Sequence, residues 1–442
     1  MLRRSRYTVT IPLSGDEYLL VNTFTGAMIS GTKDFLKAYE ADALENCSEE
    51  LVSTLFSSGF VTELTPREEM QYAFENLESI RRIYRDHTLF ILILTYQCNM
   101  RCSYCFQSRL FERHNQWLDQ TMTADQVDAA FAAIETLNPD TKMPIHLFGG
   151  EPLMYQNYDL VQYILEKGES LGKSFLVVTN GLEADKFLPL LSTSNIASLQ
   201  VTLDGIQEIH DSRKKKADGT GSFQEILSSI EQLAEAGLHV FVRVTFDHHT
   251  VRTLPAFMEV TTERGWHTHK TLSVYLSPVY HHTEGGCFNF VCNLEMGDLE
   301  FLAENEATKN AFWQGLEPLK KKLGFKDLWF PQISYCRHNP SQTWFDPFGD
   351  IYLCTDSLGD SEHAVGTYYP ALCFNEQYYA WKKRTIFDMK SCHYCKYAPI
   401  CGGGCGHYAF HEKGGLQKPD CSFVKQARRI YYPLLWKFKD LE

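Results

Sequence analysis

The chain has 442 residues, of which 44% are hydrophobic and 22% charged, a composition typical of folded proteins with about two to four domains and not of disordered ones. Its 55 acidic residues outnumber the 42 basic ones, and the resulting net charge of −13 argues against nucleic acid as the main partner. The longest purely apolar run, at 89–94, falls far short of the roughly 20 residues that cross a bilayer. We therefore expect a cytoplasmic protein with no membrane partner.

Residues 1–85 are predicted to form a small domain of their own. Residues 7–13 and 18–23 flank a Ser-Gly-Asp-Glu turn, which indicates a β-hairpin. Helical patterns follow at 33–41 and 49–58, and a charged helix is expected from Pro66 to about Arg85. A hairpin followed by small helices is typical of a winged-helix-like unit.

Residues 86–280 alternate short β-rich runs with helical stretches. The helical stretches include 124–137, 160–171 and 223–236. Six βα units predict an α/β domain with a parallel sheet, which is either doubly wound or curled into a partial barrel. The strands are predicted at 89–95, 144–148, 175–179, 198–204, 240–247 and 272–277.

The remainder of the chain has a different pattern. Residues 281–330 lose the periodicity and are interpreted as a linker or bridging region. Residues 331–442 are rich in Gly and Cys, and they are predicted to form a domain that bound ligands organise and that has little regular structure.

Fourteen cysteines in a chain expected in the cytoplasm favour metal or cluster ligation over disulfides, because the cytosol keeps thiols reduced. Cys98, Cys102 and Cys105 come directly after the first strand of the βα array, where α/β folds place their chemistry. Three thiolates with this spacing can hold a [4Fe–4S] cluster that keeps one iron without a protein ligand. A zinc site would require a fourth Cys or His nearby.

This CxxxCxxC motif, with an aromatic residue before its last cysteine, resembles that of the radical S-adenosylmethionine (SAM) family. The resemblance implies a partial (β/α)6 barrel and a cluster whose open iron chelates the amino and carboxylate groups of SAM. It also implies that the reduced cluster splits SAM into methionine and a 5′-deoxyadenosyl radical. That radical would remove hydrogen from an unactivated C–H bond.

Turns after the later strands extend the resemblance. The Gly-Gly-Glu-Pro turn receives the SAM amino group in the family, and a Thr-Asn-Gly turn follows the third strand. A Thr-Leu-Asp-Gly segment, followed by His210, Asp211 and Arg213, matches a subgroup signature. Arg243 would meet either the SAM carboxylate or a salt-bridge partner, Asp204 or Glu151. The residues implied to contact SAM are Tyr104, Gly149, Gly150, Glu151, Pro152, Asn180, Thr202, Asp204 and Arg243.

Seven further cysteines form the second site, more than one tetrahedral ion needs. Their order and spacing resemble the SPASM domain, a C-terminal extension of many radical SAM enzymes that binds two auxiliary [4Fe–4S] clusters. By this resemblance a distal cluster is held by Cys392, Cys395, Cys401 and Cys421, and a proximal cluster by Cys336, Cys354 and Cys405. Either Cys287 or Cys292 completes the proximal cluster, or one of its irons is left open for substrate.

Three [4Fe–4S] clusters and SAM are therefore the predicted cofactors. Auxiliary clusters that accept an electron would make the reaction a net oxidation, such as cross-linking or dehydrogenation. The N-terminal unit resembles the domain by which maturation enzymes recognise ribosomally made precursor peptides. We accordingly predict a radical SAM peptide maturase served by a flavodoxin-type or ferredoxin-type electron donor, with the leader added as a strand at the edge of the 7–23 hairpin.

Three alternatives stay open. The first is modification of a protein by an enzyme of the sulfatase-maturing kind. Those relatives carry an Asp directly after the second proximal cysteine, whereas Cys354 is followed by Thr355 and only then by Asp356. A small metabolite is a second possible substrate, and no catalytic acid or base is assigned. A non-enzymatic iron–sulfur electron carrier is the third alternative, but it gives no purpose to the turn at 149–152 or the polar face at 202–204.

Overall fold

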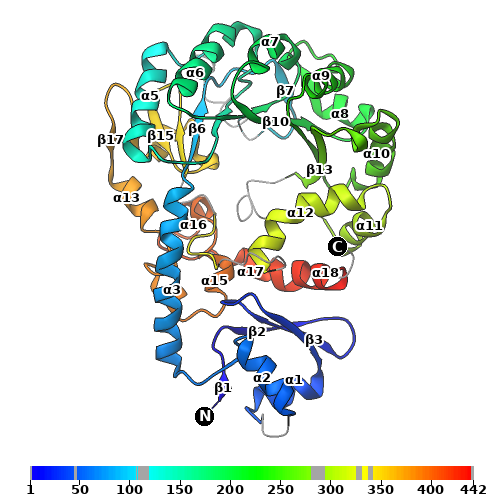
Figure 1. The fold of residues 1–442 in the computed structure, drawn as a ribbon, viewed down its shortest axis with the longest axis vertical. Helices are drawn as coiled ribbons and strands as arrows, with labels where there is room; N and C mark the ends of the chain where they lie inside the picture. The colour runs from blue at the N-terminus through cyan, green and yellow to red at the C-terminus, as the bar shows by residue number, and fades with distance from the viewer. Residues whose placement is uncertain are drawn as a thin grey trace.

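The computed structural model describes residues 2–43, 47–105, 107, 119–279, 294–324, 331–336 and 342–439. Its βα units form an open arc at one end of the molecule, and a small N-terminal domain lies at the other (Figure 1). The long helix α3 (Pro66–Asp86) runs between them, and a capping box of Thr65 and Glu68 starts it. Within the described residues no helix has the length and apolar character needed to cross a membrane.

The central sheet follows the chain order of the βα units without a reversal. All neighbouring pairs among its first six strands are parallel. In a doubly wound sheet the order of the strands reverses at a switch point. The strand order does not reverse among these six strands, so this sheet is a partial barrel. These strands are β6 (Leu89–Ile93), β8 (Ile145–Phe148), β9 (Phe175–Thr179), β10 (Ile196–Leu203), β12 (Val240–Phe246) and β13 (Leu272–Pro278).

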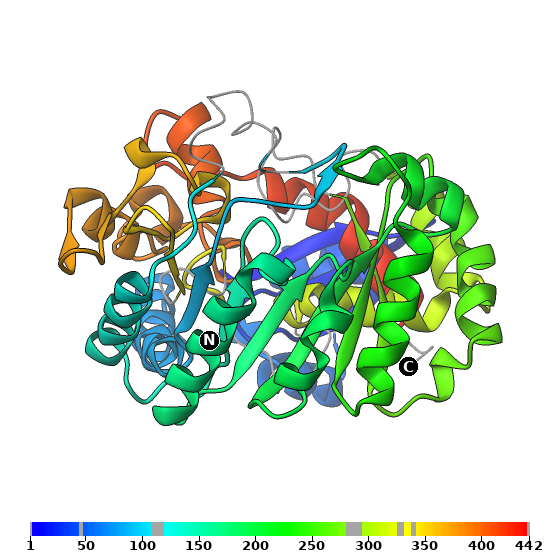
Figure 2. The same ribbon diagram turned by 90° about the horizontal axis from the view of Figure 1, so that it is seen from above.

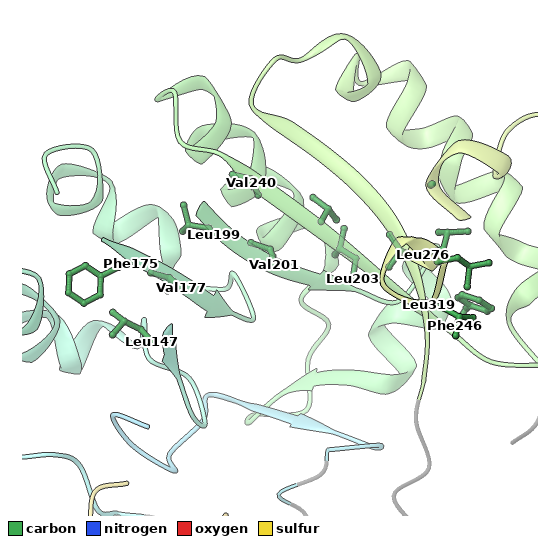
Figure 3. Close-up of a cluster of buried hydrophobic side chains, with 14 of the residues drawn as sticks. Leu147, Phe175, Val177, Leu199, Val201, Leu203, Val240, Phe246, Leu276 and Leu319 are labelled. Atoms are coloured by element: carbon green, nitrogen blue, oxygen red, sulfur yellow. The ribbon is translucent and has the colours of Figure 1, made fainter. Parts of the chain in front are cut away.

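Amphipathic helices cover the outer face of the barrel (Figure 2). Helix α5 begins with a capping box of Thr123 and Gln126, close to where the sequence pattern starts it. Figure 3 shows Val177, Val201 and Val240 on neighbouring strands of the layer that these helices bury. The covering helices include α5 (Ala124–Leu137), α6 (Tyr158–Ser170), α9 (Phe223–Glu235) and α10 (Leu254–Glu263).

The Cys-rich segment contributes more regular structure than its sequence indicates. Strand β14 (Gln342–Phe345) pairs in parallel with β6 and extends the sheet beyond the barrel. Strands β15 (Asp350–Tyr352), β16 (Gly366–Thr367) and β17 (Cys373–Phe374) continue it to ten strands. The prediction of little regular structure after residue 331 is therefore wrong, because the pairing of β14 with β6 joins segments about 250 residues apart.

The region predicted as a linker contains two helices, α11 (Met296–Glu304) and α12 (Lys309–Leu323). Helix α12 packs on β13 so closely that a Cβ at Gly315 would lie 1.8 Å from the Leu276 carbonyl oxygen. The described residues 294–324 therefore form a packed bridge to the barrel and not an extended connection.

The N-terminal domain has a three-stranded sheet where the sequence indicates a hairpin. Strands β2 (Thr8–Pro12) and β3 (Glu17–Asn22) form the predicted hairpin, and β4 (Met28–Thr32) adds a strand that its weak alternation concealed. Helices α1 (Lys33–Glu40) and α2 (Glu49–Ser57) cover one face. The other face, with Val9, Ile11, Leu19 and Val21, belongs to the main hydrophobic core of the molecule.

Short elements complete the two candidate sites. Strands β7 and β11 form an antiparallel ribbon beside the barrel mouth. The ribbon consists of β7 (Met100–Cys102) and β11 (Lys214–Lys216). Further helices are α8 (Gln207–Arg213), α13 (Glu376–Lys382), α16 (Gly406–Glu412) and α18 (Tyr432–Lys437).

Candidate functional site

A cavity of about 400 Å³ lies at the ends of the barrel strands, where β8 and β9 stop. The three cysteines of the first motif all reach it, together with residues from four strands of the barrel, from the β7–β11 ribbon and from the Cys-rich domain. Its lining consists of Cys98, Met100, Cys102, Tyr104, Cys105, Gln107, Phe148, Gly149, Gly150, Glu151, Val178, Thr179, Asn180, Gln200, Thr202, Lys214, Arg243, Thr245, Val279, Thr355 and Asp356.

Burial disfavours the charged form of two cysteine thiols of this cavity. Burial raises the pKa of Cys98 to about 12 and that of Cys102 to about 11, although Lys214 opposes the second shift. Thiols with such pKa values stay protonated at neutral pH, whereas metal coordination removes the proton outright. Coordination to an iron–sulfur cluster would thus supply the charge compensation that the buried thiolates lack.

The three cysteines of the first motif share this cavity. Within the described residues, no three Cys, His, Asp or Glu side chains surround a point that one metal ion could occupy. A [4Fe–4S] cluster binds each of its thiolates to a separate iron.

The glycine turn is joined to the backbone that precedes the cysteines. The N–H of Gly150 donates to the Thr95 carbonyl at 2.8 Å, and the N–H of Glu151 donates to the Gln97 carbonyl at 2.7 Å. A Cβ at Gly150 would lie 1.9 Å from the Gln97 oxygen, so only glycine permits this approach. The two glycines therefore serve the fit between two loops and also present backbone to the cavity.

Glu151 links this turn to the next one. Its carboxylate accepts the Thr179 hydroxyl at 2.6 Å and the Asn180 N–H at 2.6 Å, and burial raises its pKa to about 7. The Asn180 amide donates to Asn99 at 2.8 Å and faces the sulfur of Cys98 at 3.8 Å. Pro152 is buried behind the turn and does not line the cavity.

Asp204 does not line the cavity either, although the strand pattern places it with Thr202. It is fully buried beyond the end of β10, and it accepts the Tyr104 hydroxyl at 2.6 Å and the Thr245 hydroxyl at 2.8 Å. Arg213 forms an ion pair with its other oxygen at 3.1 Å. Asp204 therefore orients Tyr104, which lines the cavity, and a direct contact between Asp204 and SAM stays a prediction.

The His-Asp part of the signature has a structural role. His210 bonds to Ser222 at 3.0 Å and to the backbone N–H of Asp204 at 3.3 Å. Asp211 accepts the N–H groups of Ser222 and Phe223, which start α9. These contacts brace the turn after β10, and Arg213 of the same signature pairs with Asp204.

Thr202 and Arg243 are cross-strand partners on β10 and β12, and both reach the cavity. Asp204, one of the salt-bridge partners considered for Arg243, forms an ion pair with Arg213. Glu151 is engaged by Thr179 and backbone N–H groups.

Lys214 is a site residue that the sequence interpretation missed. A run of three lysines is typical of a solvated face, but Lys214 is only 3% exposed and its ammonium donates to the Thr202 carbonyl at 2.7 Å. Its place follows from the ribbon register, which sets Lys214 opposite Cys102. Strand alternation within the run was the available signal, since alternate residues point to opposite sides.

Two further cavity residues come from the Cys-rich domain. Thr355 and Asp356 follow Cys354 and line the cavity beside the barrel residues. Asp356 is 4% exposed. The parallel pairing of β14 with β6 brings this segment to the barrel mouth, and no local sequence pattern reports such a contact.

The four cysteines assigned to the distal cluster lie together. The thiols of Cys395 and Cys421 each contribute to raising the pKa of Cys392, and those of Cys392, Cys395 and Cys421 to raising the pKa of Cys401, after the larger effect of burial. That mutual influence requires proximity.

The segments that carry the proximal cysteines also meet. A Cβ at Gly402 would lie 2.2 Å from the Ser334 backbone, which sets the Cys336 segment against the turn before Cys405. Ser357, three residues after Cys354, contacts His407 at 3.3 Å. Cys287 and Cys292 lie outside the described residues.

The sequence profile of the Radical SAM superfamily matches residues 92–260 of the chain. Among curated proteins, a probable GTP 3′,8-cyclase of Methanococcus maripaludis is 28% identical over 182 residues, 40% of this chain and 56% of that protein. The sporulation killing factor maturation protein SkfB of Bacillus subtilis is 26% identical over 187 residues, 41% of this chain and 42% of its own length. The chain thus spans about half the length of these relatives.

Solved structures share the fold over more of the chain. Native anSMEcpe with bound AdoMet superposes with a TM-score of 0.58 at 16% identity, covering 79% of this chain and 98% of that one. Streptococcus suis SuiB bound to the precursor peptide SuiA has a TM-score of 0.55 at 14% identity, covering 96% and 99%. The predicted α/β partial barrel is confirmed by these superpositions together with the family match.

Proposed function

Residues 92–260 form a radical SAM domain, and from that premise we propose that the chain is a peptide maturase that oxidatively modifies a ribosomally made substrate. The observation that carries the proposal is the composition of the cavity. Three cysteines of the barrel and two residues of the Cys-rich domain, Thr355 and Asp356, line the same space. A substrate held there would contact both the radical source and the domain proposed to accept electrons.

Each part of the cavity has a task in this proposal. Cys98, Cys102 and Cys105 would hold the cluster, which together with SAM supplies hydrogen-atom abstraction when bound. Lys214 would donate to the carboxylate of SAM, because a buried ammonium needs an anionic partner. The glycine turn offers backbone groups, and the barrel wall excludes water from the reacting carbon.

We further propose three [4Fe–4S] clusters, reduced by a flavodoxin-type or ferredoxin-type donor. Anaerobically reconstituted protein should hold on the order of 12 iron atoms per chain, three clusters of four. Replacement of Cys98, Cys102 and Cys105 by Ala should leave roughly two thirds of that iron and abolish 5′-deoxyadenosine formation. About four iron atoms with zinc in the remainder, or SAM cleavage that persists in the triple variant, would refute the assignment.

The N-terminal sheet is the proposed binding site for the peptide leader, and β4 is its better edge. The N–H of Asn22 donates to the Ala27 carbonyl, so Ala27 faces β3. Along an antiparallel strand every second residue bonds to the same neighbour, so the N–H groups of Met28 and Ser30 point away from β3. On β2, the outward N–H of Thr8 already donates to Ser5, and Pro12 has none. Because β3 is the central strand, the expected site on the hairpin edge is revised to β4.

A matched pair of variants tests this edge. Ser30→Pro removes one outward N–H, and an edge strand tolerates proline where the N–H faces away from the sheet. Ser30→Ala keeps the N–H and is the control. Leader binding, measured by fluorescence anisotropy with a labelled precursor peptide, should weaken about fivefold to tenfold in Ser30→Pro only, the value of a lost hydrogen bond of about 1–1.5 kcal/mol. Equal binding by both variants would favour β2 or a small-metabolite substrate.

A second candidate function is maturation of a folded protein, of the sulfatase-maturing kind. Asp356 favours it, because this carboxylate lines the cavity even though it comes one residue later than in those enzymes. The two candidates differ in their need for a leader. An enzyme that modifies a short peptide without a leader at full rate would support the second candidate.

A further inference from the structure

Arg384 lies at the centre of the Cys-rich domain and is 3% exposed. Its guanidinium donates to the carbonyls of Gly403, Gly404 and Cys405 at 3.1, 3.0 and 3.3 Å. It also donates to the carbonyls of Leu416 and Lys418, the latter at 3.0 Å. One side chain therefore ties the turn before Cys405 to the segment that leads to Cys421.

The turn that Arg384 holds has an unusual backbone conformation. Gly402, Gly403 and Gly404 have φ angles of 61°, 83° and 77°, three consecutive left-handed residues. A Cβ at Gly404 would lie 1.8 Å from the Asp420 carbonyl oxygen. Buried carbonyls need donors, and the planar fork of an arginine can serve several of them at once.

The two ends of this turn belong to different proposed clusters. Cys401 is assigned to the distal cluster and Cys405 to the proximal one, and only the three glycines separate them. In the part of the chain that the structure describes, no carboxylate forms an ion pair with Arg384, and its hydrogen-bonded oxygens are all backbone carbonyls. Burial lowers the pKa of Arg384, and the neighbouring thiols of Cys405, Cys392 and Cys336 oppose that shift.

We propose that Arg384 is a positioning residue shared by the two auxiliary clusters, whose assembly it supports and whose reduction potentials it raises. Reduction adds negative charge to a cluster, and a fixed cation in a buried, low-dielectric region stabilises that charge. The same fork sets the spacing between Cys401 and Cys405. This inference rests on the auxiliary clusters of the proposed function.

The test compares Arg384→Met with Lys383→Met, a neighbouring exposed residue whose loss changes the net charge equally. Both are made in full-length protein that lacks Cys98, Cys102 and Cys105, so that only auxiliary clusters contribute iron and electron paramagnetic resonance signals. We expect Arg384→Met either to lose auxiliary iron or to keep it with lower midpoint potentials for both clusters. Lys383→Met should match its parent in iron and potentials.

Arg384→Met with the iron and potentials of Lys383→Met would overturn the proposal. If Arg384→Met does not fold, Arg384→Lys decides, because lysine keeps the charge but lacks the fork. Reduced auxiliary iron in Arg384→Lys supports the positioning role, whereas unchanged iron and potentials overturn it. The parent protein is measured first, and a parent without auxiliary iron would refute the auxiliary clusters themselves and the inference with them.

Discussion

The adjacent residues Arg213 and Lys214 point their charged side chains to different sides. Arg213 ends α8 and reaches back to Asp204, with its guanidinium 4.9 Å from the centre of the Tyr104 ring. Lys214 begins β11 and points into the cavity. A change from helix to strand between them turns the two side chains to different sides, so the pair both braces Tyr104 and places a charge beside the cysteines.

Lys214→Met should weaken SAM binding while the cluster is retained. A charge-assisted hydrogen bond contributes about 1.5–3 kcal/mol, and 1.4 kcal/mol corresponds to a factor of ten, so we expect the Kd of SAM to rise at least about tenfold. Lys215→Met is the control, because Lys215 is exposed on the outer side of the same ribbon. Equilibrium binding to reconstituted protein provides the measurement, and equal affinity in both variants would exclude contact between Lys214 and SAM.

Asp346 lies outside the cavity, and its titration makes the free energy of unfolding depend on pH. Burial raises its pKa to about 7, and its carboxylate accepts the Tyr96 hydroxyl at 3.1 Å and two backbone N–H groups. An acid whose folded pKa exceeds its unfolded value contributes stability at low pH, and that contribution is lost as the pH rises through about 7.

We expect the melting temperature to fall between pH 5.5 and pH 8, and to fall less in Asp346→Asn. The amide keeps an acceptor for the backbone N–H groups but does not ionise. Thermal melts followed by near-ultraviolet circular dichroism measure the difference. An identical pH profile in wild type and Asp346→Asn would show that Asp346 does not titrate in this range.

At the scale of elements, the turn after β8 and the loop before Cys98 form one unit. Their two backbone hydrogen bonds hold the first cysteine motif against the barrel. Glycine is required at positions 149 and 150 because a Cβ there would collide with the backbone of Thr95 or Gln97.

Gly150→Ala should separate these two loops and reduce iron at the first site. A Cβ 1.9 Å from the Gln97 oxygen forces backbone to move, because neither partner is a flexible side chain. Gly297→Ala is the control, since nothing lies within 4 Å of a Cβ there. We expect Gly150→Ala to lose up to about a third of its iron, one cluster of three, whereas Gly297→Ala keeps all of it. Full iron in both variants would contradict the role of the turn.

At the scale of the whole molecule, the N-terminal domain is continuous with the rest. Its sheet buries Val9, Ile11, Leu19 and Val21 in the main core beside Leu435 of α18. Removal of residues 1–85 would expose this apolar face, so the domain's function is better tested by single substitutions such as Ser30→Pro than by truncation.

Helix α3 connects the N-terminal domain to the loop that carries two distal cysteines. The ring of Phe74 lies 4.5 Å from that of Phe387 and 5.5 Å from that of His393, measured between centroids. Phe24 packs on the same hydrophobic cluster, which includes Cys392. The segment that carries Cys392 and Cys395 therefore presents the surface on which α3 and Phe24 rest.

Phe74→Ala should loosen this contact. Truncation of a packed aromatic ring costs about 2–4 kcal/mol, and we expect faster amide hydrogen exchange in α3 and in residues 387–397 with the barrel unchanged. Phe56→Ala is the control, because Phe56 is 50% exposed. Exchange in α3 that is equal in the two variants would show that Phe74 does not hold the helix.

Local patterns account for the parts of the fold that the sequence predicts well. The six barrel strands and helix α5 follow from alternation and helical periodicity within a few residues. The ends of strands are less well predicted, because Asp204 reads as one more residue of β10 and in fact leaves it. The close spacing of Cys98, Cys102 and Cys105 predicts one shared site, and the structure places all three on one cavity.

By itself, the sequence determined the alternation of strands and helices, the parallel sheet and the family of the barrel, because each depends on residues close together in the chain. Only the tertiary structure decided that β14 extends the sheet at β6, that Thr355 and Asp356 enter the cavity, and that β4 is an edge strand of the N-terminal sheet. The tertiary structure also decided which groups the side chains of Lys214 and Arg384 contact. Such contacts are set by packing between distant segments, and a periodicity of a few residues carries no information about which distant backbone a side chain will meet.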